Sequence, residues 1–403
     1  MSGPLDDVTV VEVDSFMAAP SAAALLADMG ARVVKVEPLQ GDPMRGLSRP
    51  LKIESAFEGY DFQFDVDNRG KRSIAVNLND SEGIEVVHRL IGGAQVFLCN
   101  LLPKRQRRFG LDAGTLFELR PGLVHATLTG YGTSGPDAWR PGYDVTAFFG
   151  RSGLYDAMRE GEDGVVPMAR PAQGDHTAGL ALAMAILAAL RLAERSGEGQ
   201  VVETSLYETA VWTQASDFCV TAMDRAPVRR RARREQLTPM TNRYPCKDGH
   251  WVVLNMLDAG AWERLCGALG RDDWLDDERY DTPKNRYRRM PELVEAIDDV
   301  LSARTRDEWG RIFDDHGVIW GPVLSLDEVP DDPQAQALGL FPPVEHPELG
   351  TYRTVNAPIR SATAEVKPRG PSPAPGEHTR EILSGLGYGN VDIQRLYDRS
   401  IVA

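Results

Sequence analysis

The sequence predicts an α/β fold in which helices cover both faces of a parallel sheet. Short runs of β-branched and other apolar residues recur along the first third of the 403-residue chain. These runs are apolar at nearly every position, which is typical of strands that are buried on both faces. Segments with a helical pattern separate them, as strand–helix–strand units require.

The first unit is expected as a strand at residues 8–13 and an Ala/Leu-rich helix at 21–29. Gly30 ends that helix in the manner of a C-terminal cap. The rest of this part is expected as strands at 32–37, 73–78, 95–99 and 123–129, with helices at 81–91 and near 115–119.

A loop-rich stretch, dense in Gly and Pro, is expected at residues 130–174, and a domain boundary is expected at the later arginine cluster. A long helix at 177–193, a strand at 200–204 and a helix at 206–213 precede an arginine cluster at 225–234, which marks a change of composition. Beyond it the pattern predicts a smaller α+β domain, with a strand at 251–256 and helices at 261–269, 291–303 and 306–315. The tail is expected to contain a Pro-rich connector at 367–375 and a last helix near 379–386.

Composition bounds the partners and the compartment. The chain has 45 basic and 59 acidic residues and a formal net charge of −14, which is unfavourable for general binding of nucleic acid or anionic membranes. The apolar run Ala178–Leu190 is shorter than the ~18 to 20 residues of a membrane span. The four cysteines lie far apart, without metal-ligand or redox spacing. We expect a cytoplasmic protein with no metal, nucleic acid or membrane partner.

A glycine pattern at residues 130–135 fits G-x-G-x-x-G and follows a predicted strand. A dinucleotide site also needs a helix to begin there, and Pro136 and Pro141 interrupt any helical pattern. The earlier turn at residues 14–20 lacks glycine, although Glu37 occupies a position suited to a ribose-binding acid. A nicotinamide site is therefore not expected.

Asp175 precedes the long helix and has two interpretations that the spacing leaves open. Its side chain could cap the helix by accepting a backbone N–H. Alternatively, the helix start could hold it ionised, and the preceding Gly174 would let another molecule approach, so that the carboxylate attacks a thioester or phosphate. His176 does not complete a serine triad, because adjacent helical residues point in different directions and no G-x-S-x-G segment is present.

Two basic patches are candidates for phosphate binding. The cluster at residues 225–234 fits either a solvated hinge or a contact with phosphate or an acidic partner. The second patch, formed by Lys104, Arg105, Arg107 and Arg108, follows a predicted strand. Because open α/β sheets bind ligands at the carboxyl ends of their strands, the second patch is the better candidate.

A series of short segments spans nearly the whole chain in a fixed order. They are Met17-Ala-Ala-Pro20, residues 25–37, Gly41-Asp-Pro-Met-Arg45, Asn68-Arg-Gly-Lys-Arg-Ser-Ile74, Gly130-Tyr-Gly with Gly135-Pro136, Pro141-Gly-Tyr-Asp144, Gly174-Asp175, Gly197-Glu-Gly-Gln200, Ser205-Leu-Tyr-Glu208 and Tyr244-Pro-Cys-Lys-Asp-Gly249. With this ordered set the chain resembles the family III CoA-transferases. That family includes formyl-CoA transferase, carnitine CoA-transferase and the α-methylacyl-CoA racemases.

The resemblance implies a domain layout and an assembly. Such proteins have a large Rossmann-like domain, built from both chain ends, and a small domain, and two ring-shaped protomers interlock as a homodimer. Applied to this chain, residues 1–215 form the N-terminal part of the large CoA-binding domain and 216–245 form a connector. Residues 246–325 form the small domain, and 326–403 form a connector and a C-terminal return to the large domain.

The resemblance also implies the chemistry. Asp175 matches the aspartate that attacks the donor acyl-CoA, after which CoA passes through an enzyme thioester to the acceptor acid. CoA is then a substrate, with a small carboxylic acid as its partner and no permanently bound cofactor. The CoA contacts carried over by position are Met17, Ala18, Val76, Asn77, Leu78, Asn79, Asn100, Leu101, Leu102, Arg108, Gly142 and Tyr143.

One position departs from the family pattern, and two alternatives to the transferase remain. Pro38 stands where many relatives have an arginine near the adenine, and Arg45 is a candidate to compensate. The racemases place histidine where this chain has Tyr143, and a phenol is a poor acceptor for an α-proton near pH 7, so a transferase is favoured over a racemase. The other alternative is a CoA-binding subunit without activity.

The sequence of the small domain does not identify the acyl group of the substrate. Trp251, Met256, Leu257, Trp262 and Trp320 fit a hydrophobic acyl site and ordinary core packing equally well.

Overall fold

A computed structural model of the chain describes residues 2–47, 60–224 and 228–403, so Arg225 of the arginine cluster lies outside the described residues. The chain divides into two compact units. The large unit comprises Met1–Tyr155, Met168–Met223 and Leu338–Ala403, and the small unit comprises Asp156–Pro167 and Asp224–Ala337.

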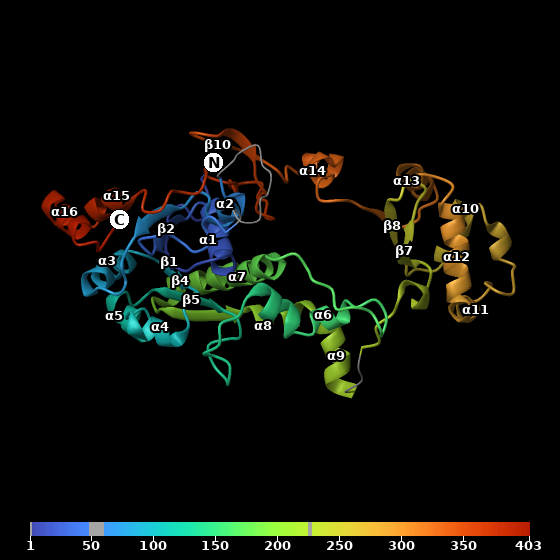
Figure 1. Cartoon of the computed structure of the whole chain (residues 1–403), viewed down its shortest axis with the longest axis horizontal. Helices are drawn as coiled ribbons and strands as arrows, with labels where there is room; N and C mark the ends of the chain where they lie inside the picture. The colour runs from blue at the N-terminus through green and yellow to red at the C-terminus, as the bar shows by residue number, and fades with distance from the viewer. Residues whose placement is uncertain (1, 48–59, 225–227) are drawn as a thin grey trace. The chain divides into compact units, whose positions relative to one another are not determined.

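The large unit contains a six-stranded sheet in which every pair of neighbouring strands is parallel (Figure 1). The strands are β1 (Thr9–Val13), β2 (Arg32–Glu37), β3 (Arg72–Ala75), β4 (Val96–Cys99), β5 (Val124–Thr129) and β6 (Gln200–Ser205). Their order is β3-β2-β1-β4-β5-β6, so the direction of progression reverses between β1 and β4. The predicted α/β class and parallel sheet are confirmed. At such a reversal, the loops leaving the two strands diverge and open a crevice for ligands.

Helices cover both faces of the sheet, because alternate strand residues point to opposite sides. Val10 and Val33 pack with α1 (Ala18–Asp28) and α7 (Gln173–Ser196) on one face. Val11 and Val34 pack on the other face, with α3 (Ser81–Gly92), α5 (Ala113–Leu119), α15 (Thr379–Gly385) and α16 (Asn390–Asp398). The near-continuous apolar strands are explained by these two buried layers.

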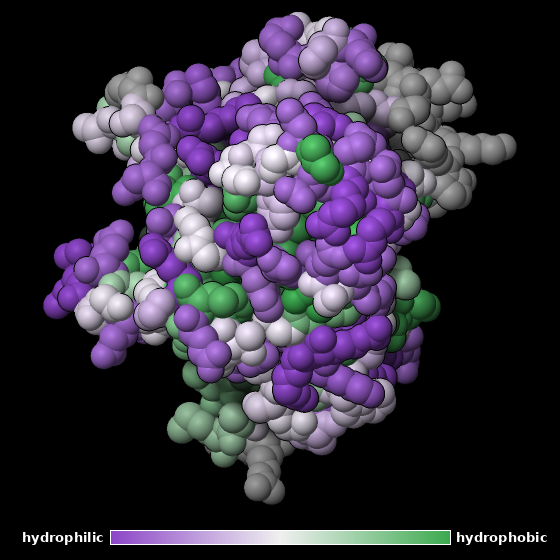
Figure 2. Space-filling view, turned by 90° about the vertical axis from the view of Figure 1, so that its left-hand side faces the viewer, coloured by the Kyte–Doolittle hydropathy of each residue, from purple (hydrophilic) through white to green (hydrophobic). Residues whose placement is uncertain are grey.

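The C-terminal segment is joined to the end of β3. The backbone N–H of Asn77 donates to the carbonyl of Ile401 at 2.8 Å, and Val76 forms an antiparallel bridge with Val402. Thr379 Oγ1 donates to the carbonyl of Ala403 at 2.6 Å. Figure 2 shows the face of the molecule toward α3, α15 and α16, and this surface is mostly hydrophilic.

The remaining elements of the large unit are short. They are α2 (Phe62–Asn68), α4 (Pro103–Arg108), a π-helical turn η2 (Asp144–Gly150), α6 (Leu154–Ala157), α8 (Leu206–Thr213), α9 (Ala215–Asp224) and the hairpin β10 (Pro343–His346) and β11 (Gly350–Arg353). Helices of six or seven residues, such as α2 and α4, show no sustained periodicity, and the sequence analysis did not predict them.

Helix α7 is the one helix in the described part of the chain that is long and apolar enough to cross a membrane, judged by length and composition. Its residues Ala178, Leu182 and Ile186 are buried with α1 and the sheet. A core helix of a folded domain has this pattern. The helix begins at Gln173, four residues before the predicted start.

The small unit is built around a three-stranded antiparallel sheet of β7 (Thr241–Pro245), β8 (Trp251–Asn255) and β9 (Trp320–Val323). Its helices are α10 (Ala261–Leu269), α11 (Pro283–Arg288), α12 (Met290–Leu301), α13 (Arg306–Asp315) and α14 (Pro333–Ala337), with short 3-10 turns at Arg233–Glu235, Asp272–Trp274 and Val329–Asp331. Met256 and Trp262 are buried in its core, whereas Leu257 is exposed. The ring of Trp262 stacks on that of Trp274, with the ring centroids 6.1 Å apart. Core packing therefore accounts for Met256 and Trp262 among the apolar residues that were candidates for an acyl site.

Candidate active site

The loops that leave β1 and β4 contain several of the residues singled out in the sequence. Asn100 follows β4, and its Nδ2 donates to the carbonyl of Ser15 in the β1–α1 loop at 2.7 Å. Met17 directly precedes α1, Ala18 is the first residue of that helix, and Leu101 follows Asn100 after β4; Ala18 and Leu101 are buried. The structure thus brings Met17, Ala18, Asn100 and Leu101 to one edge of the sheet.

Phe16 occupies a strained position in the same loop. Its φ is +66°, a region that non-glycine residues seldom adopt, and its N–H donates to Asp42 Oδ1 at 3.2 Å. The ring meets the ring of Tyr143 edge-on, with centroids 5.4 Å apart. Tyr143 is largely exposed. This ring contact joins the β1–α1 loop to the segment that carries Tyr143, and the sequence analysis did not identify Phe16.

Buried ion pairs hold the β1–α1 loop in place. Lys35 Nζ lies 2.9 Å from Asp14 Oδ1 and 3.0 Å from Asp42 Oδ2, and Lys71 Nζ lies 2.7 Å from Glu12 Oε1. Burial, with the nearby charge of Asp14, raises the pKa of Glu12 to about 8. Because a buried charge without its partner is costly, this network holds the loop in one conformation.

Glu37 and Arg45 are engaged with each other. Arg45 donates to both carboxylate oxygens of Glu37 at 2.7 Å and to the carbonyl of Pro373 at 2.9 Å. Its guanidinium also lies over the ring of Phe64. The hypothesis that Arg45 compensates for Pro38 at a nucleotide is therefore wrong in this structure, since the guanidinium is occupied by internal contacts. The Glu37 carboxylate is also occupied by internal contacts, because it accepts a further hydrogen bond from Ser73 Oγ at 2.6 Å.

The loop after β3 meets the basic helix α4. Arg108 Nη2 donates to Asn79 Oδ1 at 2.9 Å, and both side chains are exposed. Asn77 and Leu78 are half-buried in the same loop, and Val76 is buried. Leu102 precedes α4 at the carboxyl end of β4. Two predicted groups, residues 76–79 and Arg108, are thus in contact, at the same edge of the sheet as the crevice.

The loop after β5 approaches the segment that carries Tyr143. A Cβ on Gly130 would lie 2.5 Å from the Cα of Gly142, so the two backbones touch only because both residues are glycine. This close approach aligns the Gly142–Tyr143 segment with the end of β5. The quoted glycines at 130 and 142 therefore serve backbone packing, and no dinucleotide loop is formed.

Asp144, which the sequence analysis did not select as a site residue, caps helix α7. Its Oδ2 accepts the N–H of Ala172, the residue before the helix, at 2.7 Å. A Cβ on Gly174 would lie 2.2 Å from Asp144 Oδ1 and 2.2 Å from the ring of Phe148. The capping interpretation of Asp175 is wrong: α7 begins at Gln173, and Asp175 is its third residue.

The carboxylate of Asp175 is half-buried and makes no hydrogen bond with any described residue. Burial, reinforced by the negative charges of Asp144 and Asp67, raises its pKa to about 7, and His176 acts in the opposite direction. The expectation that the helix start keeps Asp175 ionised is therefore wrong, because the pKa of this carboxyl is raised and not lowered. The helix dipole is outweighed by desolvation and by two neighbouring carboxylates.

His176 and Asp67 form a pair beside Asp175. The Nε2 of His176 lies 3.0 Å from Oδ1 of Asp67, which belongs to α2. Burial would lower the pKa of His176, but the hydrogen bond and charge of Asp67, with the charges of Asp175 and Asp144, raise it. Asp67 and His176 were not predicted as site residues.

The arginine cluster lies in the small unit and is mostly paired there. Arg230 bridges Asp156 and Glu162, and two neighbouring arginines form ion pairs at 2.6 Å, Arg233 with Asp298 and Arg234 with Glu295. Exposed pairs of this kind contribute little stability. They satisfy these three guanidinium groups within the protein, which favours the structural interpretation over phosphate binding.

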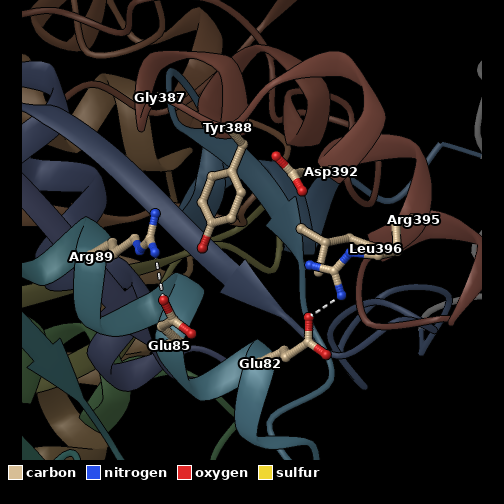
Figure 3. A pocket seen from close by; sticks show the side chains of 8 residues that line it. All are labelled: Glu82, Glu85, Arg89, Gly387, Tyr388, Asp392, Arg395 and Leu396. Carbon is tan, nitrogen blue, oxygen red and sulfur yellow. Dashed lines mark hydrogen bonds and ion pairs between the residues drawn. The ribbon is translucent and has the colours of Figure 1, made fainter.

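A separate polar pocket of about 210 Å³ lies between α3 and the C-terminal helices (Figure 3). Arg89 pairs with Glu85, and Arg395 pairs with Glu82. The Arg89 guanidinium also lies over the ring of Tyr388. Since both lining arginines are neutralised, this pocket lacks the free positive charge that a phosphate needs. In the described residues no group of three His, Cys, Asp or Glu side chains is arranged to hold a metal ion.

Comparisons with known proteins agree on one family. The family model described as CoA-transferase family III matches residues 5–379. The chain is 31% identical over 400 residues to the (R)-2-hydroxy-4-methylpentanoate CoA-transferase of Clostridioides difficile, covering 99% of each chain. It is 33% identical to the cinnamoyl-CoA:phenyllactate CoA-transferase of Clostridium sporogenes, over 96% of this chain and 95% of the relative.

The comparison with solved structures also finds similarity along nearly the whole chain. The crystal structure of a CAIB/BAIF family protein from Brucella suis superposes with a TM-score of 0.85 and 28% sequence identity. It covers 96% of this chain and 100% of that one. The similarity therefore extends through nearly the whole chain and includes both units.

Proposed function

From the premise that the chain belongs to CoA-transferase family III, we propose that it moves CoA from an acyl-CoA donor to a carboxylic acid through a covalent intermediate on Asp175. The observation that carries this proposal is the position of Asp175. It lies in the first turn of α7, after Gly174, and Asp144 rather than Asp175 occupies the cap. The carboxylate of Asp175 is therefore left available for chemistry.

The proposed reaction needs only oxygen and sulfur nucleophiles. A carboxylate oxygen of Asp175 attacks the thioester carbonyl, the C–S bond breaks, and CoA leaves as the thiolate, which gives a mixed anhydride. The thiolate then attacks the aspartyl carbonyl, which releases the donor acid and forms an aspartyl-CoA thioester. The acceptor carboxylate attacks that thioester, and the released thiolate attacks the acceptor's carbonyl in the new anhydride. Acceptor-CoA leaves and Asp175 is regenerated.

We assign the CoA contacts to the loops at the carboxyl edge of the sheet. The proposed residues are Met17, Ala18, Val76, Asn77, Leu78, Asn79, Asn100, Leu101, Leu102, Arg108, Gly142 and Tyr143. The contact between Arg108 and Asn79 supports the assignment, because it presents an exposed guanidinium beside the β3 loop. CoA is a substrate in this scheme. The relative from Clostridium sporogenes is named for a CoA ester and a free acid, cinnamoyl-CoA and phenyllactate, which supports a carboxylic acid as the second substrate.

We also propose that the protein works as an interlocked homodimer, with residues 216–245 and 326–403 containing the connectors. The support is an apolar hollow of about 450 Å³ on α8 and α9. Its lining includes Trp212, whose side chain is 77% exposed, and Met223 is also exposed. Met184 of α7 is exposed as well. Large exposed apolar areas of this kind are typical of surfaces that a partner chain covers.

The test combines a substrate panel with trapping at Asp175. Acetyl-, butyryl-, succinyl- and cinnamoyl-CoA are each incubated with butyrate, succinate, 3-phenylpropionate and 3-phenyllactate, and CoA exchange is followed by mass spectrometry. We expect exchange with at least one pair, and hydroxylamine or borohydride should label Asp175 during turnover. Asp175→Asn should lose at least ~1,000-fold in kcat, because the nucleophile is absent.

The same samples distinguish transfer from racemisation. In deuterated water, a racemase would incorporate deuterium at Cα of 2-methylbutyryl-CoA without any acceptor acid. We expect no α-deuteration, since Tyr143 replaces the histidine of the racemases. Exchange that persists in Asp175→Asn, or α-deuteration without transfer, would contradict the proposal.

A further inference from the structure

The pair of His176 and Asp67 leaves one imidazole nitrogen available. Nε2 is held at 3.0 Å by Oδ1 of Asp67, while Nδ1 makes no hydrogen bond with any residue that the structure describes. The His176 side chain is 45% exposed, whereas Asp67 as a residue is 2% exposed. The ring is therefore fixed from the buried side and open on the other.

The surroundings of His176 are strongly acidic. Asp67 comes from α2, Asp144 from η2 and Asp175 from the first turn of α7, and the charges of all three act on the imidazole. His176 is the group of opposite charge that acts on Asp175 among the described residues. An acceptor acid would bring one more carboxylate to this place. Its approach would be repelled unless a cation met it.

We propose that His176, held by Asp67, binds the carboxylate of the acceptor acid next to Asp175. This inference rests on the proposed CoA transfer and adds the group that admits the second substrate. The imidazolium donates its Nδ1–H to one carboxylate oxygen of the acid, and the other oxygen remains free to attack the aspartyl-CoA thioester. Successive helical residues are rotated by about 100°, so His176 stands beside Asp175 without covering it.

Asp67 has the role of a positioning residue. Its hydrogen bond to Nε2 orients the ring and leaves Nδ1 as the nitrogen without a partner among the described residues, and its charge favours the imidazolium. The second oxygen, Oδ2, is buried and has no partner in the described chain. A buried carboxylate with one satisfied oxygen depends on its histidine partner, which couples the two residues.

The first experiment measures binding without turnover. The pKa of the His176 imidazole is followed by NMR in the full-length protein, with His176→Gln identifying its signal. Butyrate and 3-phenylpropionate are added in turn, with butyramide as the neutral control. We expect the carboxylates to raise the imidazole pKa and butyramide to leave it unchanged, because only an anion stabilises the imidazolium. A response to neither carboxylate would overturn the proposal.

The second experiment separates the two Michaelis constants. His176→Gln should raise the KM of the acceptor acid by on the order of 10-fold and change the KM of the donor acyl-CoA less than twofold, because one charge-assisted hydrogen bond to the acid is lost. His176→Lys should keep the low acceptor KM, and keep it to higher pH than the wild type. Asp67→Asn should shift the rise in acceptor KM to lower pH. His88→Gln, whose imidazole contacts the Gly110 carbonyl, is the control.

Failure of this inference differs from failure of the proposed function. If exchange depends on Asp175 but His176→Gln has an unchanged acceptor KM, or if both constants rise equally, the acceptor site is wrong and the transferase stands. If the wild type shows no Asp175-dependent exchange with any pair, the proposed function itself fails.

Discussion

At the scale of single residues, Asp175 combines two demands that oppose each other. A nucleophilic carboxylate must be ionised, yet burial and the charges of Asp144 and Asp67 raise its pKa to about 7. A partly desolvated carboxylate is a stronger nucleophile than a hydrated one, and the cost falls on the stability of the folded protein.

The pH dependence of the reaction follows from this pKa. Because only the ionised carboxylate attacks the thioester, kcat/KM for the donor acyl-CoA should rise with pH and level off above about 7. The measurement is a pH–rate profile from pH 5 to 9 with a saturating acceptor. A profile that is already flat at pH 5 would contradict the raised pKa.

Stability should respond to the same group with a definite sign. The pKa of Asp175 is about 7 in the folded chain, and it is near ~3.9 in the unfolded chain. Unfolding therefore releases a proton between these values, so the ionised residue destabilises the fold above pH 7 and has no effect below pH 4. Asp175→Asn should stabilise the protein by on the order of 1–2 kcal/mol at pH 8 and by almost nothing at pH 4. Denaturant unfolding at both pH values checks this, and equal effects would contradict it.

At the scale of elements, the start of α7 is assembled from three segments that are distant in sequence. Asp144 is the first residue of the turn η2 and caps α7, and Asp67 comes from α2. Gly174 permits this assembly, because it leaves room for the Asp144 carboxylate and the Phe148 ring. The geometry around Asp175 thus depends on the packing of η2 against α7.

Gly174→Ala should disrupt this contact. The new Cβ would lie 2.2 Å from both Asp144 and Phe148, so one of them must move, at a cost of about 1–3 kcal/mol in unfolding free energy. We expect kcat to fall more than 10-fold, because a displacement of about 1 Å at a reacting group is costly.

The matched control is Gly92→Ala at the end of α3. No atom lies within 4 Å of the position of its new Cβ. This change should leave kcat unaltered and stabilise the protein slightly, by up to ~1 kcal/mol, through helix propensity. If both alanine variants behave alike in denaturant unfolding and in kcat, close packing at Gly174 is not important.

At the scale of the whole molecule, the proposed dimer explains the exposed apolar hollow on α8 and α9. Sedimentation velocity at micromolar concentration should give a dimer. Trp212→Asp should weaken it, since a charge would be buried against the partner. Val391 of α16 is 83% exposed, and Val391→Asp should leave the dimer intact. A wild-type monomer, or equal effects of the two substitutions, would contradict the assembly.

The sequence by itself determined the parallel sheet and the family. Near-continuous apolar strands need burial on both faces, and this requirement is visible locally along the first third of the chain. The residue at the centre of the proposed chemistry, Asp175, could also be selected, because the Gly174-Asp175 pair at a helix start belongs to an ordered set of segments that spans the chain.

Only the tertiary structure decided what surrounds Asp175. Asp67 and Asp144 lie 108 and 31 residues before it in the sequence, and no local periodicity marks a contact made by folding. Asp144 instead of Asp175 caps α7, and burial, reinforced by the charges of Asp144 and Asp67, raises the pKa of Asp175 instead of lowering it. Local patterns report propensity and burial, whereas the charge state of a side chain depends on every group that the fold brings near it.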